Sequence, residues 1–172
     1  IEDVIVPFVL DAGVFFRNAA KSKRTGLEVG VSSELIRGLT LKGSYAYQNF
    51  KYDSYLAGNI DISGNLTNVD YSGNKEASNP DNFFTGEIMY QHTIAKKYTI
   101  YAKSSIQYVG GMFVDDANTE ELKTEPYTLV NGQVGVDCDF NNLRLVAYGG
   151  LNNIADKKYV AFININSDKS EF

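Results

Sequence analysis

The chain has 172 residues and a formal net charge of -5 at pH 7, with one cysteine and one histidine. This acidic balance argues against a nucleic-acid partner, because a phosphate backbone is bound by basic surfaces that displace counterions. One cysteine permits no internal disulfide and no thiolate metal cluster. No apolar run approaches the roughly 18 residues of a membrane-spanning helix. The 12 Tyr, 10 Phe and 15 Gly beside only 3 Pro favour strands.

The first residues predict a strand and a loop. Asp3 to Leu10 is a short apolar run that contains Pro7, which suits a strand end or an edge strand. Asp11-Ala12-Gly13 predicts a turn, and Phe15 to Arg24 is expected to be an exposed loop. The chain begins inside an apolar run without an initiator Met or a signal peptide, so we expect a segment of a longer protein.

From Gly26 onward, apolar and polar residues alternate with a period of two, which predicts strands with two different faces. Residues 27–32 and 39–48 are two such strands, joined by a tight reversal at Arg37-Gly38. A long polar connection is expected from Asp53 to Asn82, far above the median loop length of roughly 4–6 residues. Residues 84–91 form the next alternating strand.

The same pattern continues to the end of the chain. Ala95-Lys96-Lys97 predicts a tight turn into the strand 100–108, and Asp115 to Glu125 is a second polar excursion. Val130 to Phe140 then alternates over about twice the usual strand length of roughly 5–6 residues. A turn at Asn141-Asn142 leads into residues 143–150. Another turn or loop is expected at 152–159, and Val160 to Ile165 is a candidate for a further strand.

Tight and long connections alternate along the chain, so all tight turns should lie at one end of the sheet and all long loops at the other. This sorting predicts an all-β, antiparallel up-and-down meander and is typical of outer-membrane barrels. Tyr45, Tyr47, Tyr90 and Tyr108 on the apolar face would suit aromatic girdles. Alternation by itself leaves open whether the apolar medium is lipid or a protein core.

Polar residues supply the candidate site positions. One set is predicted to face a hydrated lumen, where the alternative role is structural ion pairing: Glu28, Lys42, Glu87, Lys103, Gln107, Gln133, Asp137 and Asp139. A second set lies in the long connections, where the alternative is a solvated loop: Asn59, Asp61, Asp70, Asp115, Asp116 and Asn118.

Residues 59–70 loosely resemble an EF-hand calcium loop, with oxygen-bearing side chains at positions 1, 3, 5, 9 and 12 and glycine at 6. The neutral first ligand and the short Asp70 at position 12 argue against calcium, so we expect no metal and no cofactor. We also expect no enzyme, because the chain has no nucleophile motif or phosphate-binding loop. His92 is expected to be structural or interfacial, and Cys138 a buried, inert thiol.

With the strands placed, the chain resembles the C-terminal barrel region of TonB-dependent outer-membrane receptors. The resemblance rests on short segments: Phe16–Ala19, Arg24–Glu28, Leu41–Tyr47, Gly73-Asn74-Lys75 before Pro80, Tyr127–Asn131 and Asn152–Tyr159. The chain departs from the family pattern at Glu76–Asn79, where Leu-Pro-Gly-hydrophobic is usual, and at Ile154-Ala155, where Leu-Phe is commoner.

The resemblance implies that residues 1–172 form part of a 22-stranded barrel, without the N-terminal plug, the TonB box and the final strand. It implies a ferric siderophore or similar scarce nutrient as ligand, a TonB complex as partner through the absent N-terminal part, and a location among outer-membrane lipids of a Gram-negative cell. A segment alone should transport nothing. Two alternatives stay open, a small passive or structural outer-membrane barrel and a soluble β-rich ligand-binding module.

Overall fold

The protein is described from a computed structural model. The model describes the backbone of residues 4–10, 13–60, 66–140 and 142–161, and the side chains of residues 21–58, 68–140 and 142–161. Within these residues the chain forms eight strands and one short 3₁₀ helix. They are β1 (Val4–Leu10), β2 (Gly13–Ile36), β3 (Leu39–Ile60), β4 (Leu66–Asp70), β5 (Asn82–Ile94), β6 (Tyr98–Val109), η1 (Glu120–Leu122), β7 (Tyr127–Phe140) and β8 (Leu143–Leu151).

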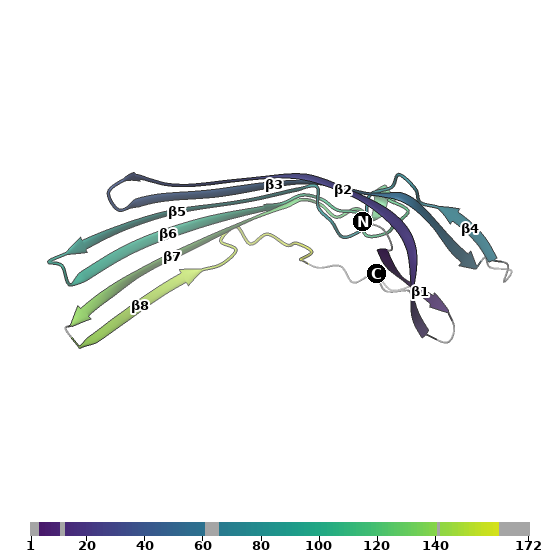
Figure 1. Ribbon diagram of the computed structural model, residues 1–172. Helices are drawn as coiled ribbons and strands as arrows, with labels where there is room; N and C mark the ends of the chain where they lie inside the picture. The colour runs from purple at the N-terminus through teal and green to yellow at the C-terminus, as the bar shows by residue number, and fades with distance from the viewer. Residues whose placement is uncertain (1–3, 11–12, 61–65, 141, 162–172) are drawn as a thin grey trace.

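The strands form one antiparallel sheet in the order β1-β2-β3-β5-β6-β7-β8, and β4 pairs with the end of β3. The tight turns after β2, β5 and β7 lie together at one end, and the long connections lie at the other (Figure 1). The predicted up-and-down meander with sorted connections is therefore confirmed. Among the described residues no helix is long and apolar enough to span a membrane.

The tight turns follow from local backbone chemistry. Gly38 has φ +82°, and a Cβ at this position would lie 2.2 Å from the carbonyl oxygen of Gln91, so only glycine fits. Ala95 and Lys96 both have positive φ, which is the geometry of a type I′ turn, and the Lys97 amide donates to the Ile94 carbonyl at 3.1 Å. These turns hold the strand registers on either side.

Two sequence-based boundaries are wrong. Residues 15–24, expected to be a loop, belong to β2, which begins at Gly13. The expected connection 53–82 is much shorter, because β3 runs to Ile60 and β4 follows. β2 and β3 both continue past the rest of the sheet (Figure 1). They pair with each other as far as Ala20 with Tyr55. The parts of β2 and β3 that project beyond the sheet need no apolar face. They therefore lack the alternation of apolar and polar residues that marks the other strands.

Other expectations at the chain ends are met in part. β1 pairs only with β2 among the described strands, so Pro7 does lie on an edge strand. The expected turn residues Asp11 and Ala12 lie outside the described residues. Residues 152–161 form turns and irregular structure, so the described part of 160–165 contains no strand, and the remainder lies outside the described residues.

The sheet is a single layer with one apolar and one polar face. Residues paired across antiparallel strands share a face, and the pairs Leu41–Ile88 and Ala102–Val134 lie on the apolar side. No described element covers this side, and Val134 is 62% exposed. Its large exposed members include Leu27, Val29, Val31, Leu41, Tyr45, Phe84, Ile88, Tyr90, Ile100, Val134, Leu145 and Leu151.

We expect spin labels at Val134 and Asp137 in the complete, membrane-inserted protein to show opposite accessibilities, because alternate residues of β7 point to opposite faces. Apolar oxygen should relax the label at position 134 more strongly, and a water-soluble nickel complex the label at 137. The reverse order would show that the polar face is the one in contact with lipid.

Candidate functional site

The candidate site lies at the loop end of the sheet, where the connections 71–81 and 110–126 pack against the projecting parts of β2 and β3. The Ser78 amide donates to the Phe113 carbonyl at 2.8 Å, and the Gly110 amide donates to the Asn82 carbonyl at 2.8 Å. The buried hydrophobic residues of the described chain gather at this end: Tyr52, Tyr55, Ala57, Val109, Met112, Phe113 and Tyr127.

Asn118 joins the two connections through both atoms of its amide. Its Oδ1 accepts from the Lys75 amide at 2.6 Å, and its Nδ2 donates to the Lys75 carbonyl at 2.8 Å. The side chain therefore imitates one residue of a neighbouring strand. Asn74 adds a further link, because its Nδ2 donates to the Asp116 carbonyl at 2.8 Å.

Asp116 is partly buried and accepts hydrogen bonds from two tyrosines. The Tyr52 hydroxyl donates to its Oδ1 at 2.7 Å, and the Tyr55 hydroxyl donates to its Oδ2 at 3.3 Å. Burial raises the pKa of the Asp116 carboxyl, and this effect outweighs the two hydrogen bonds, which lower it. Burial and the neighbouring carboxylate also raise the pKa of Tyr52, so its hydroxyl stays a donor.

The remaining predicted loop residues have local roles or are not described. Asp115 accepts from the Thr119 amide at 2.9 Å and from its hydroxyl at 2.6 Å. Asp70 is exposed and accepts from the Ser72 amide at 2.9 Å. The side chain of Asn59 and all of Asp61 lie outside the described residues. The structure thus brings Asp115, Asp116 and Asn118 together, and ligand binding by any of this set stays a prediction.

A second polar centre at Glu76 was not predicted from the sequence. Its carboxylate is buried and accepts from Arg24 Nε at 3.1 Å and from Arg24 Nη2 at 2.8 Å. Ser22 donates to the same carboxylate. The bidentate pair fastens residue 76 to β2, about 50 residues earlier in the chain. One sequence signal could have pointed to Glu76. It directly follows Gly73-Asn74-Lys75, at a position where TonB-dependent receptors usually have an apolar residue.

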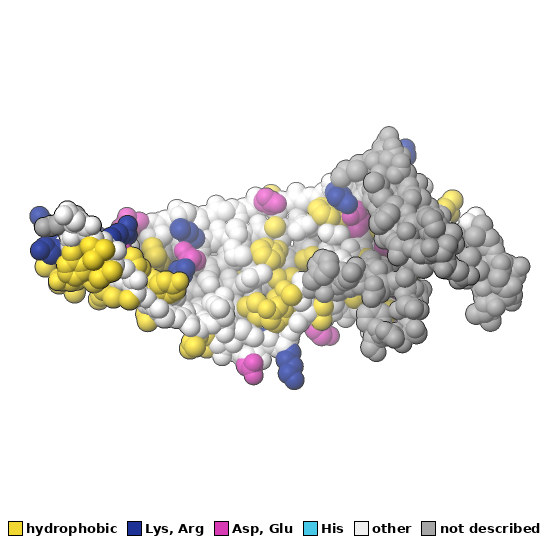
Figure 2. Space-filling view, turned by 90° about the horizontal axis from the view of Figure 1, so that it is seen from below, with side chains coloured by type: hydrophobic (Ala, Val, Ile, Leu, Met, Phe, Trp, Pro, Cys, Tyr) yellow, Lys and Arg dark blue, Asp and Glu magenta, His cyan; other side chains and the backbone are white. Residues whose placement is uncertain are grey.

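The polar face carries the residues predicted to face a lumen. Glu87 lies between two lysines, with Lys42 Nζ at 3.6 Å and Lys103 Nζ at 3.9 Å. Arg144 donates to Asp137 with a distance of 2.9 Å from Nε to Oδ1. Figure 2 shows acidic and basic side chains close together toward the turn end of the sheet.

Cross-strand pairing puts the other predicted residues on this same face. Glu28 pairs with Ala46, Gln107 with Thr85, and Gln133 with Lys103. Asp139 pairs with Arg144 on β8. The face is therefore polar and nearly charge-balanced, and exposed ion pairs of this kind contribute only about 0–1 kcal/mol each.

Metal binding has no visible support in the described part of the chain, which contains no group of three or more His, Cys, Asp or Glu side chains able to hold an ion. The EF-hand-like pattern at 59–70 lies partly outside the described residues, so the absence of calcium there stays a prediction.

A single-layer antiparallel sheet with an exposed apolar face, a charged opposite face and packed loops at one end is a segment of a transmembrane β-barrel wall. The model of the TonB dependent receptor-like β-barrel family matches residues 1–154. The chain belongs to this family of outer-membrane transport receptors.

Curated relatives and a solved structure agree with this assignment. The chain is 30% identical to a ferrioxamine receptor of Yersinia enterocolitica over 152 residues, covering 86% of this chain and 19% of the relative. It is 27% identical to a ferrioxamine B receptor of Salmonella typhimurium over 150 residues, covering 87% and 19%. The fold is similar to BauA, the ferric preacinetobactin receptor of Acinetobacter baumannii, with a TM-score of 0.66 and 14% identity over 90% of this chain and 22% of that one.

The raised pKa of Asp116 makes the packing of the two loops depend on pH. A folded-state pKa above the unfolded value means that folding favours the protonated carboxyl, so the stability contribution is full below about pH 4 and is lost as the pH rises through the folded pKa. We expect amide protection factors in 71–81 and 110–119, corrected for intrinsic exchange, to fall over this range. Asp116→Asn should abolish the change, and an unchanged pH dependence in that variant would assign it to another group.

Glu76→Ala is expected to loosen the loops without unfolding the barrel, because it leaves Arg24 and Ser22 without their shared acceptor. Losing a charged hydrogen-bond partner costs about 1–3 kcal/mol of stability. We expect a cost toward the lower end of this range because Arg24 is partly exposed. Hydrogen exchange in 71–81 should accelerate accordingly. Glu120→Ala, which removes an exposed carboxylate 3.4 Å from Lys123, is the matched control and should leave exchange there unchanged.

Proposed function

We propose that the complete protein is an outer-membrane receptor of a Gram-negative cell that binds and imports a ferric siderophore. Residues 1–172 supply part of the C-terminal barrel wall and its extracellular loops. The family match over residues 1–154 carries the proposal, and the ferrioxamine receptors that align with 86–87% of the chain support it.

The physical arrangement supports a wall-and-loop role. The apolar face suits contact with lipid, because no described element packs over it, and the polar face suits a hydrated interior. At the loop end, Glu76 and Asp116 fasten the two long connections to β2 and β3, and Asn118 joins the connections to each other. Loops held in place in this way lose less conformational entropy when they contact a ligand than free loops would.

A ferric hydroxamate siderophore of the ferrioxamine type is the proposed ligand. The identity of the ligand is inferred from the two ferrioxamine receptors. The chain spans about a fifth of their length. The predicted loop positions Asn59, Asp61, Asp70, Asp115, Asp116 and Asn118 remain the proposed region of contact. No metal or cofactor of the protein itself is part of this proposal, and the iron arrives as cargo.

Transport is tested with the complete gene in an iron-starved host that lacks its own siderophore receptors. We expect uptake of radioactive iron from ferrioxamine B, loss of uptake when the host lacks TonB, and much weaker uptake from a ferric catecholate. Normal outer-membrane abundance without binding of either ferric siderophore would contradict the proposed function.

Shortening the β3–β4 hairpin should separate ligand capture from barrel assembly. Gly58 pairs with Asn68, so residues 59–67 can be replaced by an Asn-Gly turn that keeps the pairing below. We expect weaker ferrioxamine binding with nearly normal abundance in the outer membrane, because surface loops tolerate changes in length. Reduced abundance with normal binding per molecule would instead make the hairpin a folding element.

A further inference from the structure

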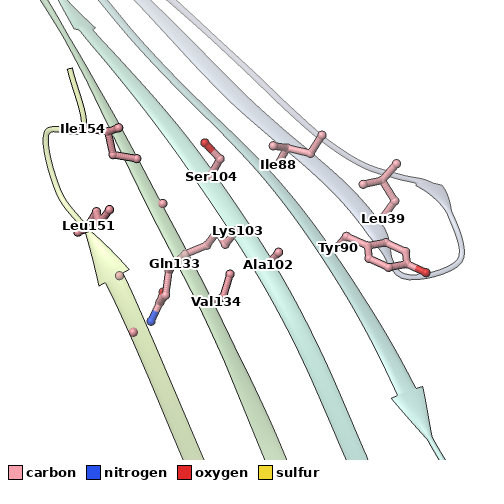
Figure 3. A pocket seen from close by; sticks show the side chains of 13 residues that line it. Leu39, Ile88, Tyr90, Ala102, Lys103, Ser104, Gln133, Val134, Leu151 and Ile154 are labelled. Atoms are coloured by element: carbon pink, nitrogen blue, oxygen red, sulfur yellow. The ribbon is translucent and has the colours of Figure 1, made fainter.

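An apolar groove of about 620 Å³ lies on the exposed apolar face, within the roughly 300–1,000 Å³ typical of small-molecule sites. Small residues form its floor, including Ala102 and Gly132. Leu39 and Tyr90 stand on one side, and Leu151 and Ile154 stand on the other (Figure 3). The groove is therefore a depression between two ridges on the face that contacts lipid.

The far ridge is held in place by the backbone of the segment after β8. The Ile154 amide donates to the Val130 carbonyl at 2.8 Å, and the Asn153 amide donates to Asn131 Oδ1 at 2.9 Å. A Cβ at Gly132 would lie 3.2 Å from Ile154 Cδ1. The absence of a side chain at Gly132 thus lets Ile154 approach the sheet and shape the groove.

Polar groups stand where the groove meets the turn end. Tyr90 lines the groove, and a Cβ at Gly38 would lie 3.8 Å from its ring, so the groove adjoins the Arg37-Gly38 turn. His92 is on the same face, because it pairs with Ile100, and lies about 7 Å beyond Tyr90 along the strand. Within the described chain, no hydrogen bond or ion pair engages the exposed side chains of Arg37 and His92.

The tight turns also carry basic side chains. Arg37, Lys96 and Lys97 are exposed in the tight turns, and Figure 2 shows Lys and Arg side chains at this end of the sheet. Basic side chains beside a lipid surface attract anionic headgroups. An apolar channel ending at donors and positive charge is complementary to one molecule, a phospholipid with its acyl chain in the channel and its phosphate at the turns.

We propose that this groove binds an acyl chain of a membrane phospholipid, with the lipid phosphate held by Arg37, His92 and the Tyr90 hydroxyl. The proposal rests on the proposed function only in taking this face to lie in the membrane. An acyl chain in the groove makes dispersion contacts with the side chains that line it. The headgroup donors fix that chain at one position, unlike the lipids that exchange over the rest of the face.

Native mass spectrometry of the complete, delipidated receptor tests the groove, with phosphatidylglycerol titrated into the detergent. We expect one phosphatidylglycerol to remain bound under activation that strips the others. Ala102→Leu should weaken this binding about tenfold, corresponding to roughly two lost methylene contacts. Ala147→Leu is the matched control, because Ala147 is an exposed residue on the same face, paired with Val136 and outside the groove.

The headgroup site is tested separately with Arg37→Gln combined with His92→Leu. Retention of phosphatidylglycerol should fall several-fold, whereas retention of phosphate-free diacylglycerol should stay unchanged. Equal losses for both lipids, equal effects of Ala102→Leu and Ala147→Leu, or no retained lipid in the wild type would overturn the proposal. Ferrioxamine binding should be normal in all these variants, so failure of the lipid site and failure of the proposed transport function are distinguishable.

Discussion

The structure depends on one constraint, the exposure of the whole apolar face of a single-layered sheet. Leu27, Val31 and Val134 are each more than half exposed, and no described element packs over them. A soluble sandwich would place a second sheet there, since a large contiguous apolar surface is unstable in water. In the proposed outer-membrane setting, lipid would cover the apolar groups while the backbone pairs between strands, which is the condition for a spanning β structure. The other face is then free to carry charge.

The loop end differs from the rest of the sheet because it contains a hydrophobic core of its own. Tyrosines from β3 provide it, packed with Asp116 and with the connections that return across them. Tyr52 and Tyr55 have ring centroids 4.7 Å apart, close enough for a favourable tilted contact. Each buried carboxylate has donors from another segment, so burial of charge here specifies which segments meet and does not simply add stability.

These two regions divide the work expected of a receptor wall. The sheet itself contains repeated cross-strand pairs with short turns, and the buried hydrophobic residues of the described chain lie at the loop end. The loop part contains long-range contacts such as Arg24 with Glu76, whose positions depend on the folded chain. Sequence change in the loops can therefore alter their packing while the wall remains intact. The apolar groove shows that the wall also has local shape, set by small residues facing large ones.

The sequence by itself determined most of the strands, the tight turns and the two faces, because apolar and polar side chains alternate wherever the sheet has one apolar and one polar face. Gly38 and the pair Ala95-Lys96 mark turns that the backbone requires. The sequence did not predict the part of β2 that projects beyond the sheet, and it did not predict β4. Strands without an apolar face need not alternate apolar and polar residues. Nor did the sequence reveal that Glu76 meets Arg24 or that Tyr52 meets Asp116. Those contacts join residues more than 50 positions apart, and only the tertiary structure, by folding the loops back over the strands, decides which distant polar groups become partners.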